Sequence, residues 1–224
     1  MLVGLIAPQD MAADILPWAL DGFLKAQPDA SPDQLQITGV TLPGEDPNTT
    51  GGGRMAFDAF INQADGDTRF AIGCLDGRQR AAIAGQLLDA NLVPGSLFHP
   101  TTNIRMDVTI GEGAIMGPAT ELTANLSIGK FFFCQGLTYV AHDCKVGDFV
   151  TIDRSVGVNG NIFLGDFVHI GNSVVIRPGT LEAPTQIGAG ARLADGSVVT
   201  KDVPADAVVL GNPAKPITEN QPGA

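Results

Sequence analysis

Three histidines are present in the sequence, and their neighbours indicate which of them is suited to catalysis. His142 stands directly before Asp143 in the segment YVAHDC. A carboxylate next to an imidazole raises its basicity and orients the ring, so this pair is suited to general-base chemistry. The structural alternative is a solvated His-Asp pair on the surface. His99, in Phe-His-Pro, and His169, directly before an apolar residue, are expected to have structural roles.

An eighteen-residue repeat surrounds His142 and must position it. Segments that start at residues 110, 128, 146 and 164 read IGEGAI, IGKFFF, VGDFVT and LGDFVH. Every sixth residue from Ile104 to Ile176 is apolar, and glycine often follows it. A step of five then leads to Leu181, and the step of six resumes at Ile187. The repeating unit is therefore a hexapeptide, with three units in each larger turn.

A period of six residues suits neither a helix nor a single alternating strand. It suits a short strand followed by a turn, so that three units form one triangular coil. Such coils stack at the strand spacing of about 4.8 Å, and equivalent residues form ladders. The expected ladders are Ala114, Phe132, Val150 and Val168, pointing inward, and Phe131, Phe149 and Phe167. A right-handed solenoid or a sandwich is the alternative architecture.

The coil register places a glycine beside His142. Gly160 follows it by eighteen residues, so we expect it one coil on, at about 5 Å. A glycine leaves its backbone N–H accessible, which makes this position a candidate oxyanion donor beside a candidate base. The same register argues against a zinc enzyme, because His169 lies 27 residues, or one and a half coils, from His142 and a third ligand is missing. No metal is expected.

Residues 1–98 are expected to form a small α/β domain, and residues 99–224 the repeat domain. Apolar runs and helical segments alternate in the first part, which predicts a parallel sheet with ligands at the strand carboxyl ends. The predicted strands are 2–7, 35–42, 70–73 and 96–99, and the predicted helices are 11–23, kinked or restarted at Pro17, and 77–90. The turn after the first strand, APQDM, contains no glycine, unlike a typical nucleotide-binding turn. Gly51–Gly53 is expected to be a flexible loop.

Charge and composition exclude several classes of protein. The chain carries 24 acidic and 13 basic residues, and its formal net charge is -11. Both parts of the chain are acidic, so neither offers the basic surface that nucleic acids require. No apolar run is long enough for a signal peptide or a membrane span. The three cysteines, an odd number without metal-site spacing, suit reduced thiols in the cytoplasm.

Several motifs together resemble the sialic-acid O-acetyltransferase family of hexapeptide-repeat acyltransferases. This group includes bacterial enzymes that N-acetylate UDP-4-amino sugars and nucleotide-linked perosamine. The resemblance covers nearly the whole chain, and it implies a small sugar-binding domain followed by a left-handed parallel β-helix. It rests on His99-Pro100, on HDCKVGD from His142, on VVTKDVP from Val198 and on GNPAK from Gly211.

The resemblance implies an acetyl-CoA-dependent transfer of acetyl to an amine or hydroxyl of a nucleotide-linked sugar for surface polysaccharide. It also implies a homotrimer, with acetyl-CoA in a groove between adjacent β-helices. His142 is then the general base, Asp143 its partner and Gly160 the oxyanion donor. The positions expected to contact acetyl-CoA are Thr151, Asn172 and Gly190, with Arg192, Lys201 or Lys215 at its phosphates.

The sequence departs from the family pattern at three places. Thr151 stands where several relatives have a histidine that contacts the cofactor. The glycines after the first strand are absent, so Gln9 and Asp10 are the residues at that turn expected to contact the sugar, and Gly73 is kept after a later strand. The acidic pair after the second strand is replaced near Leu42-Pro43-Gly44. The alternatives are therefore a changed acceptor without UDP, and a non-catalytic trimer that binds a sugar or a partner protein.

Overall fold

The computed structural model describes residues 1–47 and 53–217, and the chain divides into two compact units. The first unit contains residues 1–100 with residues 112–115, and the second contains residues 101–111 and the chain from residue 116 onward. Gly51 and Gly52 of the predicted flexible loop lie outside the described residues. Within the described ranges, no helix is long and apolar enough to cross a membrane.

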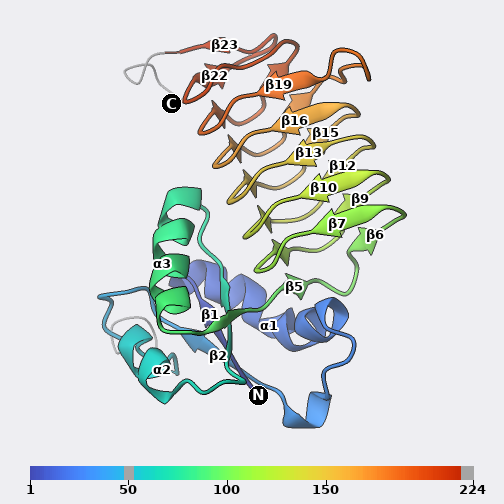
Figure 1. Ribbon diagram of the computed structural model, residues 1–224. Coiled ribbons are helices and arrows are strands. Elements are labelled where there is room, and N and C mark those ends of the chain that lie inside the picture. The colour runs from blue at the N-terminus through green and yellow to red at the C-terminus, as the bar shows by residue number, and fades with distance from the viewer. Residues whose placement is uncertain (48–52, 218–224) are drawn as a thin grey trace. The chain divides into compact units, whose positions relative to one another are not determined.

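A parallel sheet forms the centre of the first unit, as the alternation of strands and helices predicts (Figure 1). Its strand order is β2-β1-β3-β4. β1 pairs on both sides and is almost completely buried, which explains its unbroken apolar sequence. The strands are β1 (Leu2–Ile6), β2 (Gln36–Val40), β3 (Arg69–Ile72) and β4 (Val93–Pro94), followed by β5 (Leu97–Phe98). The helices are α1 (Gln9–Ala26), α2 (Phe57–Gln63) and α3 (Gly77–Asp89), with a 3-10 turn at Pro32–Gln34.

α1 is one helix that continues through Pro17, so the predicted restart at this residue is wrong. Proline removes one backbone donor, but the buried face of the helix continues on both sides of it. Ile15 lies before the proline, Phe23 lies after it, and both are buried. Packing of this face outweighs the local cost of the proline. α2 was not predicted, because its seven residues are too few for a clear helical period.

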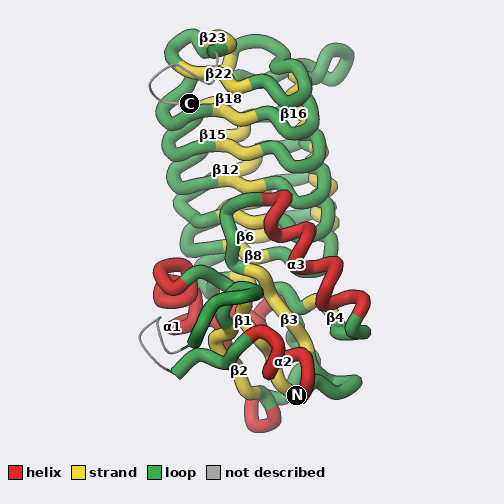
Figure 2. The backbone as a smooth tube through the Cα atoms, turned by 90° about the vertical axis from the view of Figure 1, so that its left-hand side faces the viewer, coloured by secondary structure: helices red, strands yellow, loops and turns green. Residues whose placement is uncertain are grey.

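The second unit is a left-handed parallel β-helix, as the hexapeptide pattern and its resemblance predict (Figure 2). Each coil contributes one short strand to each of three parallel sheets. The β7–β19 sheet contains β7 (Val108–Ile110), β10 (Leu126–Ile128), β13 (Lys145–Val146), β16 (Ile162–Leu164) and β19 (Thr185–Ile187). The β8–β22 sheet contains β8 (Ile115–Met116), β11 (Phe133–Cys134), β14 (Thr151–Ile152), β17 (His169–Ile170), β20 (Arg192–Leu193) and β22 (Val208–Leu210), with β23 (Lys215–Pro216) antiparallel at its end. The β6–β21 sheet contains β6 (Asn103–Ile104), β9 (Glu121–Leu122), β12 (Tyr139–Val140), β15 (Gly157–Val158), β18 (Val175–Ile176) and β21 (Val198–Val199).

Ladders of equivalent side chains fill the interior of the β-helix and stack along its corners. The predicted inward ladder is fully buried at all four positions, Ala114, Phe132, Val150 and Val168. The phenylalanine ladder is also confirmed, since the rings of Phe131 and Phe149 stack at 5.0 Å and those of Phe149 and Phe167 at 5.4 Å. Stacked apolar columns hold successive coils in one register, and this register fixes which polar residues meet at the corners.

One coil carries an insertion, and here the sequence pattern fails. Phe163 pairs with Gln186, which is 186 − 163 = 23 residues on, whereas Lys145 pairs with Phe163 after 163 − 145 = 18. The five extra residues form a loop, so Leu181 is 74% exposed and does not continue the inward series. Because this leucine is apolar, it matched the sequence pattern although it lies on a loop. Periodicity alone cannot distinguish an inward residue from an apolar residue at a loop tip.

Candidate active site

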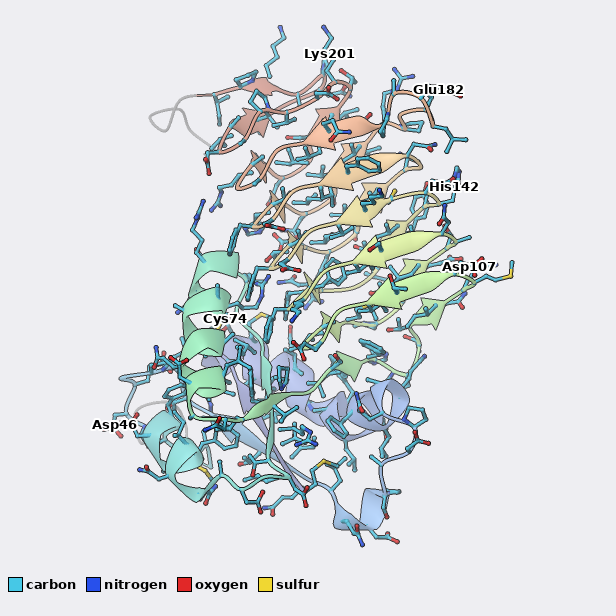
Figure 3. The ribbon with its side chains drawn as sticks, viewed as in Figure 1. Asp46, Cys74, Asp107, His142, Glu182 and Lys201 are labelled. Atoms are coloured by element: carbon cyan, nitrogen blue, oxygen red, sulfur yellow. The ribbon has the colours of Figure 1, made fainter. Side chains whose placement is uncertain are left out.

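His142 and Asp143 lie at the corner between β12 and β13, on an edge of the β-helix (Figure 3). Asp143 Oδ2 lies 2.7 Å from His142 Nδ1, and the histidine side chain is 60% exposed. Asp143 has φ +59°, a left-handed conformation that aspartate tolerates better than most residues. With the carboxylate at Nδ1, the Nε2 atom carries the free lone pair. This arrangement is suited to taking a proton from a substrate.

Asn125 completes the pair, and the sequence analysis missed it. It lies one coil before Asp143, in the same left-handed corner conformation, and its Nδ2 donates a hydrogen bond of 2.5 Å to Asp143 Oδ1. The hydrogen bonds from His142 and Asn125 lower the pKa of the Asp143 carboxyl below its ordinary value. Asp143 therefore stays ionised beside the imidazole. The eighteen-residue register contained this signal, since 143 − 18 = 125.

Gly160 lies against the His142 ring, so the one-coil register predicted for these residues is confirmed. Strand pairing aligns Val140 with Val158, and His142 and Gly160 each follow two residues later. A Cβ atom on Gly160 would lie 2.7 Å from His142 Cε1 and 2.8 Å from Nε2. Only glycine allows the imidazole to lie over the backbone here. Among the described residues we find no acceptor for the Gly160 N–H, and its role as an oxyanion donor stays a prediction.

Cys144 follows the pair directly but is buried beneath it. Burial raises the pKa of its thiol to about 11, and the Sγ atom donates to the carbonyl of Asn159 at 3.2 Å. A protonated, buried thiol is a poor nucleophile. Of these two neighbours, His142 is therefore the candidate for proton transfer.

A groove of about 350 Å³ adjoins Asp143 on the outer face of the β7–β19 sheet. Its floor carries polar side chains from successive strands, among them Ser127 and Lys145. The ammonium of Lys145 lies 5.0 Å from the centre of the Phe163 ring, and Leu181 of the inserted loop forms part of the wall. The groove is therefore a cavity beside Asp143 that is lined by both polar and apolar side chains.

The residues predicted to contact acetyl-CoA lie on other parts of the β-helix. Thr151 and Arg192 share one column of the β8–β22 sheet, two rungs apart; Thr151 is buried and Arg192 is exposed. Asn172 lies at the corner after β17 and Gly190 at the corner before β20. Lys201 lies three coils above His142 at the same kind of corner. A single chain does not bring the first four of these together with His142.

The predicted substrate-binding residues lie in the first unit. Gln9 and Asp10 are exposed in the first turn of α1, directly after β1. Gly73 follows β3, and a Cβ atom there would lie 2.9 Å from Ile15 Cδ1 and 3.1 Å from Ala7 Cβ. Close packing between α1 and the sheet accounts for this glycine.

Arg54 is a further polar feature of the first unit that the sequence analysis missed. Its Nη2 donates to the carbonyl of Ala7, after β1, and at 2.6 Å to the carbonyl of Val40, at the end of β2. The Nε and Nη1 atoms are buried without a hydrogen-bond partner. A Cβ atom on Gly39 would lie 3.3 Å from Arg54 Cγ, so this glycine makes room for the arginine stem. The carboxyl ends of two parallel strands thus carry a guanidinium with spare donors.

No cluster of three metal-ligating side chains occurs in the part of the chain that the structure describes. The His99 ring packs against Trp18 at 5.2 Å in the first unit. Desolvation, with a smaller effect from the Lys25 charge, lowers the pKa of His99.

Comparison with solved structures gives the family of this protein. WeeI from Acinetobacter baumannii AYE is 31% identical, with a TM-score of 0.83, and the match covers 97% of this chain and 100% of that chain. The chain belongs to the hexapeptide-repeat sugar acetyltransferase family. Membership confirms the predicted enzyme class. No protein-family model matches this sugar acetyltransferase, and no curated protein sequence does.

Two more distant solved structures share the fold of the sugar acetyltransferase. The acetyltransferase domain of PglB from Neisseria gonorrhoeae FA1090, in complex with acetyl coenzyme A, is 20% identical with a TM-score of 0.79, and the match covers 96% of this chain and 98% of that chain. A perosamine N-acetyltransferase mutant from Caulobacter crescentus, in complex with CoA and GDP-perosamine, is 19% identical with a TM-score of 0.77, covering 96% and 97%.

Proposed function

We propose that this sugar acetyltransferase moves the acetyl group of acetyl-CoA to an amine or hydroxyl of a nucleotide-linked sugar, with His142 as the general base. The observation that carries the proposal is the corner geometry. An imidazole oriented by an ionised carboxylate lies directly over a glycine whose N–H is available. A base and an oxyanion donor on adjacent coils are the two groups that acyl transfer from a thioester needs.

The proposed reaction assigns each proton and bond. The acceptor nitrogen or oxygen attacks the thioester carbonyl, and His142 Nε2 takes its proton. The carbonyl oxygen becomes an oxyanion that accepts a hydrogen bond from the Gly160 N–H. Collapse of the intermediate breaks the C–S bond, completes the amide or ester, and returns the proton from His142 to the CoA thiolate. Asp143 holds the ring and stabilises the imidazolium that forms during the transfer.

The binding of acetyl-CoA is proposed to need a second chain. Thr151, Asn172, Gly190 and Arg192 lie away from the His142 corner in one chain, and Lys201 lies three coils above it. In a homotrimer, the corner of one β-helix meets the β8–β22 sheet of its neighbour and completes the site. Arg192 and Lys201 then supply positive charge to the CoA phosphates on an otherwise acidic protein. Light scattering at micromolar concentration tests this, and the mass of a single chain would contradict it.

The acceptor is proposed to bind through the first unit. In the domain division 1–98 and 99–224, the first part holds the sugar and the second transfers the acetyl group. Gln9, Asp10 and Gly73 lie at or near the carboxyl edge of its sheet, and Arg54 places a guanidinium charge at the same edge. Positive charge at this edge favours an anionic acceptor, such as a sugar linked to nucleotide phosphates. The proposed role is surface polysaccharide synthesis in the cytoplasm, where three free, buried cysteines stay reduced.

The deciding experiment is turnover of purified protein with acetyl-CoA and a panel of free and nucleotide-linked amino sugars, followed as release of the CoA thiol. His142→Gln is expected to lower kcat by about 10³-fold, because a general base contributes about 10² to 10⁴. His99→Gln is the matched control and should retain turnover, since the His99 ring packs against Trp18 within the first unit. Full activity of His142→Gln would refute the mechanism. Acetyl-CoA binding without turnover on any acceptor would favour the non-catalytic alternative.

A further inference from the structure

A second His-Asp pair lies on the β8–β22 sheet, formed by residues sixteen positions apart in the sequence. His169 Nε2 lies 3.1 Å from Asp153 Oδ2, and the two side chains are 21% and 10% exposed. His169 alternates with the fully buried Ile170, so its side chain lies on the outer face of the sheet. The sequence analysis assigned His169 a structural role and did not single out Asp153.

Asp153 is buried in a way that packing alone does not explain. The residue is 7% exposed, and its Oδ1 atom is buried without a hydrogen-bond partner. A carboxylate with one oxygen unsatisfied in the interior costs free energy, so a chain under selection for stability alone would not retain it. Such groups are concentrated at functional sites. The cost is offset if Asp153 keeps His169 in a useful state.

The position of Asp153 decides which histidine nitrogen is available. A carboxylate accepts hydrogen bonds, so Nε2 carries the proton and donates to Oδ2. Nδ1 is then left with a lone pair, and it has no partner among the residues that the structure describes. His169 therefore presents a hydrogen-bond acceptor, held by the buried aspartate.

His169 and Asp153 line a groove of about 400 Å³ on the same sheet. Leu193, Ala194, Val208 and Leu210 give this groove apolar walls, and Arg192 lies one rung above His169. A ligand that fits these features has an apolar stem, an N–H group that meets the imidazole acceptor, and an anionic group that meets the guanidinium. The pantetheine arm of CoA, with two amides and an adjoining pyrophosphate, has all three.

We propose that His169, positioned by Asp153, accepts a hydrogen bond from a pantetheine amide N–H of acetyl-CoA, while Arg192 on the next coil contacts the pyrophosphate. The inference rests on the proposed function, since it assigns one wall of the proposed cosubstrate site. It gives His169 a role in binding the cosubstrate and Asp153 a role in positioning His169. Neither residue takes part in the proton transfer at His142.

The test is a thermodynamic cycle that combines the change of one ligand atom with the substitution of one residue. The affinity for each ligand is measured by calorimetric titration without acceptor. The ligands are CoA and two analogues in which one pantetheine amide N–H is replaced by an ester oxygen. For the natural protein, one of the analogues is expected to bind about tenfold more weakly than CoA. His169→Phe and Asp153→Asn are expected to bind CoA about tenfold more weakly and to bind that analogue with no further loss. Asparagine at 153 can either donate to Nε2 or accept from it, so it no longer fixes the tautomer that presents Nδ1 as an acceptor.

Asp166→Asn is the matched control, because Asp166 is an exposed coil carboxylate that caps the Asp148 N–H at 2.8 Å and lies outside the groove. It should bind all three ligands as the natural protein does. The inference is overturned if the variants bind CoA as tightly as the natural protein does. It is also overturned if their affinities for CoA and for both analogues fall by the same factor. Natural protein that binds CoA but releases none from acetyl-CoA with any acceptor would refute the proposed function alone.

Discussion

The two His-Asp pairs of this protein use the same side chains in opposite surroundings. His142 and Asp143 are neighbours in sequence at an exposed corner, and both oxygens of the aspartate have partners. His169 and Asp153 come from adjacent coils and are mostly buried, and one aspartate oxygen has no partner. An exposed, fully supported pair can exchange protons with a substrate, whereas a buried pair with a fixed tautomer is suited to static recognition. Location in the coil therefore separates the chemistry of the two pairs.

Matched substitutions of the two aspartates should separate the pairs kinetically, and this is the largest effect expected from comparing the pairs. Asp143→Asn is expected to lower kcat by about 10²-fold, because the imidazole loses its orienting carboxylate, with KM for acetyl-CoA within about twofold. Asp153→Asn is expected to raise that KM about tenfold and leave kcat within about twofold. Steady-state rates over a range of acetyl-CoA concentrations measure both. The distinction fails if both variants change the same kinetic constant.

A methyl group at Gly160 should disturb the exposed pair selectively. The new Cβ would lie within 2.8 Å of the imidazole, so Gly160→Ala must displace the ring, and we expect kcat to fall about tenfold to hundredfold. Gly157→Ala is the matched control in the same coil, because its Cβ would meet nothing closer than Tyr139 Cε1 at 3.7 Å. Equal effects of the two substitutions would show that loss of activity comes from backbone change and not from contact with His142.

Removal of the Asn125 side chain should have the smallest effect on kcat, and it should also change how stability depends on pH. Asn125→Ala takes away one of the hydrogen bonds that lower the Asp143 pKa, so that pKa should rise toward its ordinary value of 3.8. A carboxyl with a depressed pKa contributes stability above its unfolded pKa and loses it as the pH falls through its folded pKa. The variant should therefore lose less stability than the natural protein as the pH falls from about 5 to about 2, because its folded and unfolded pKa values lie closer together. We expect kcat at neutral pH to fall about threefold.

Denaturant unfolding between pH 2 and pH 7, with turnover at pH 7, measures these changes. Asn91→Ala is the matched control, because Asn91 is exposed in the first unit with a similar left-handed φ of +62°. It reproduces the backbone strain of an alanine at such a position without touching Asp143. An identical acid profile for the natural protein and Asn125→Ala would show that Asn125 does not support the pair.

The predictability of this fold follows from its periodicity. Strict hexapeptides fix the sequence separation of neighbouring coils, so the inward ladder, the phenylalanine ladder and the contact between His142 and Gly160 all follow from counting. Asn125 lies in the same count and was missed only because its role needs the carboxylate geometry. The first unit has no such period, and α2 and the continuous α1 were therefore harder to predict.

By itself, the sequence determined the β-helix, the acetyltransferase family and the adjacency of His142 and Asp143, because these depend on local pattern and a constant coil length. Only the tertiary structure decided that the coil with Leu181 carries a five-residue insertion and that Arg54 spans the ends of two strands. It also decided that Asp153 meets His169. The physical reason is that these contacts depend on side-chain reach and burial across sequence separations that no repeat specifies.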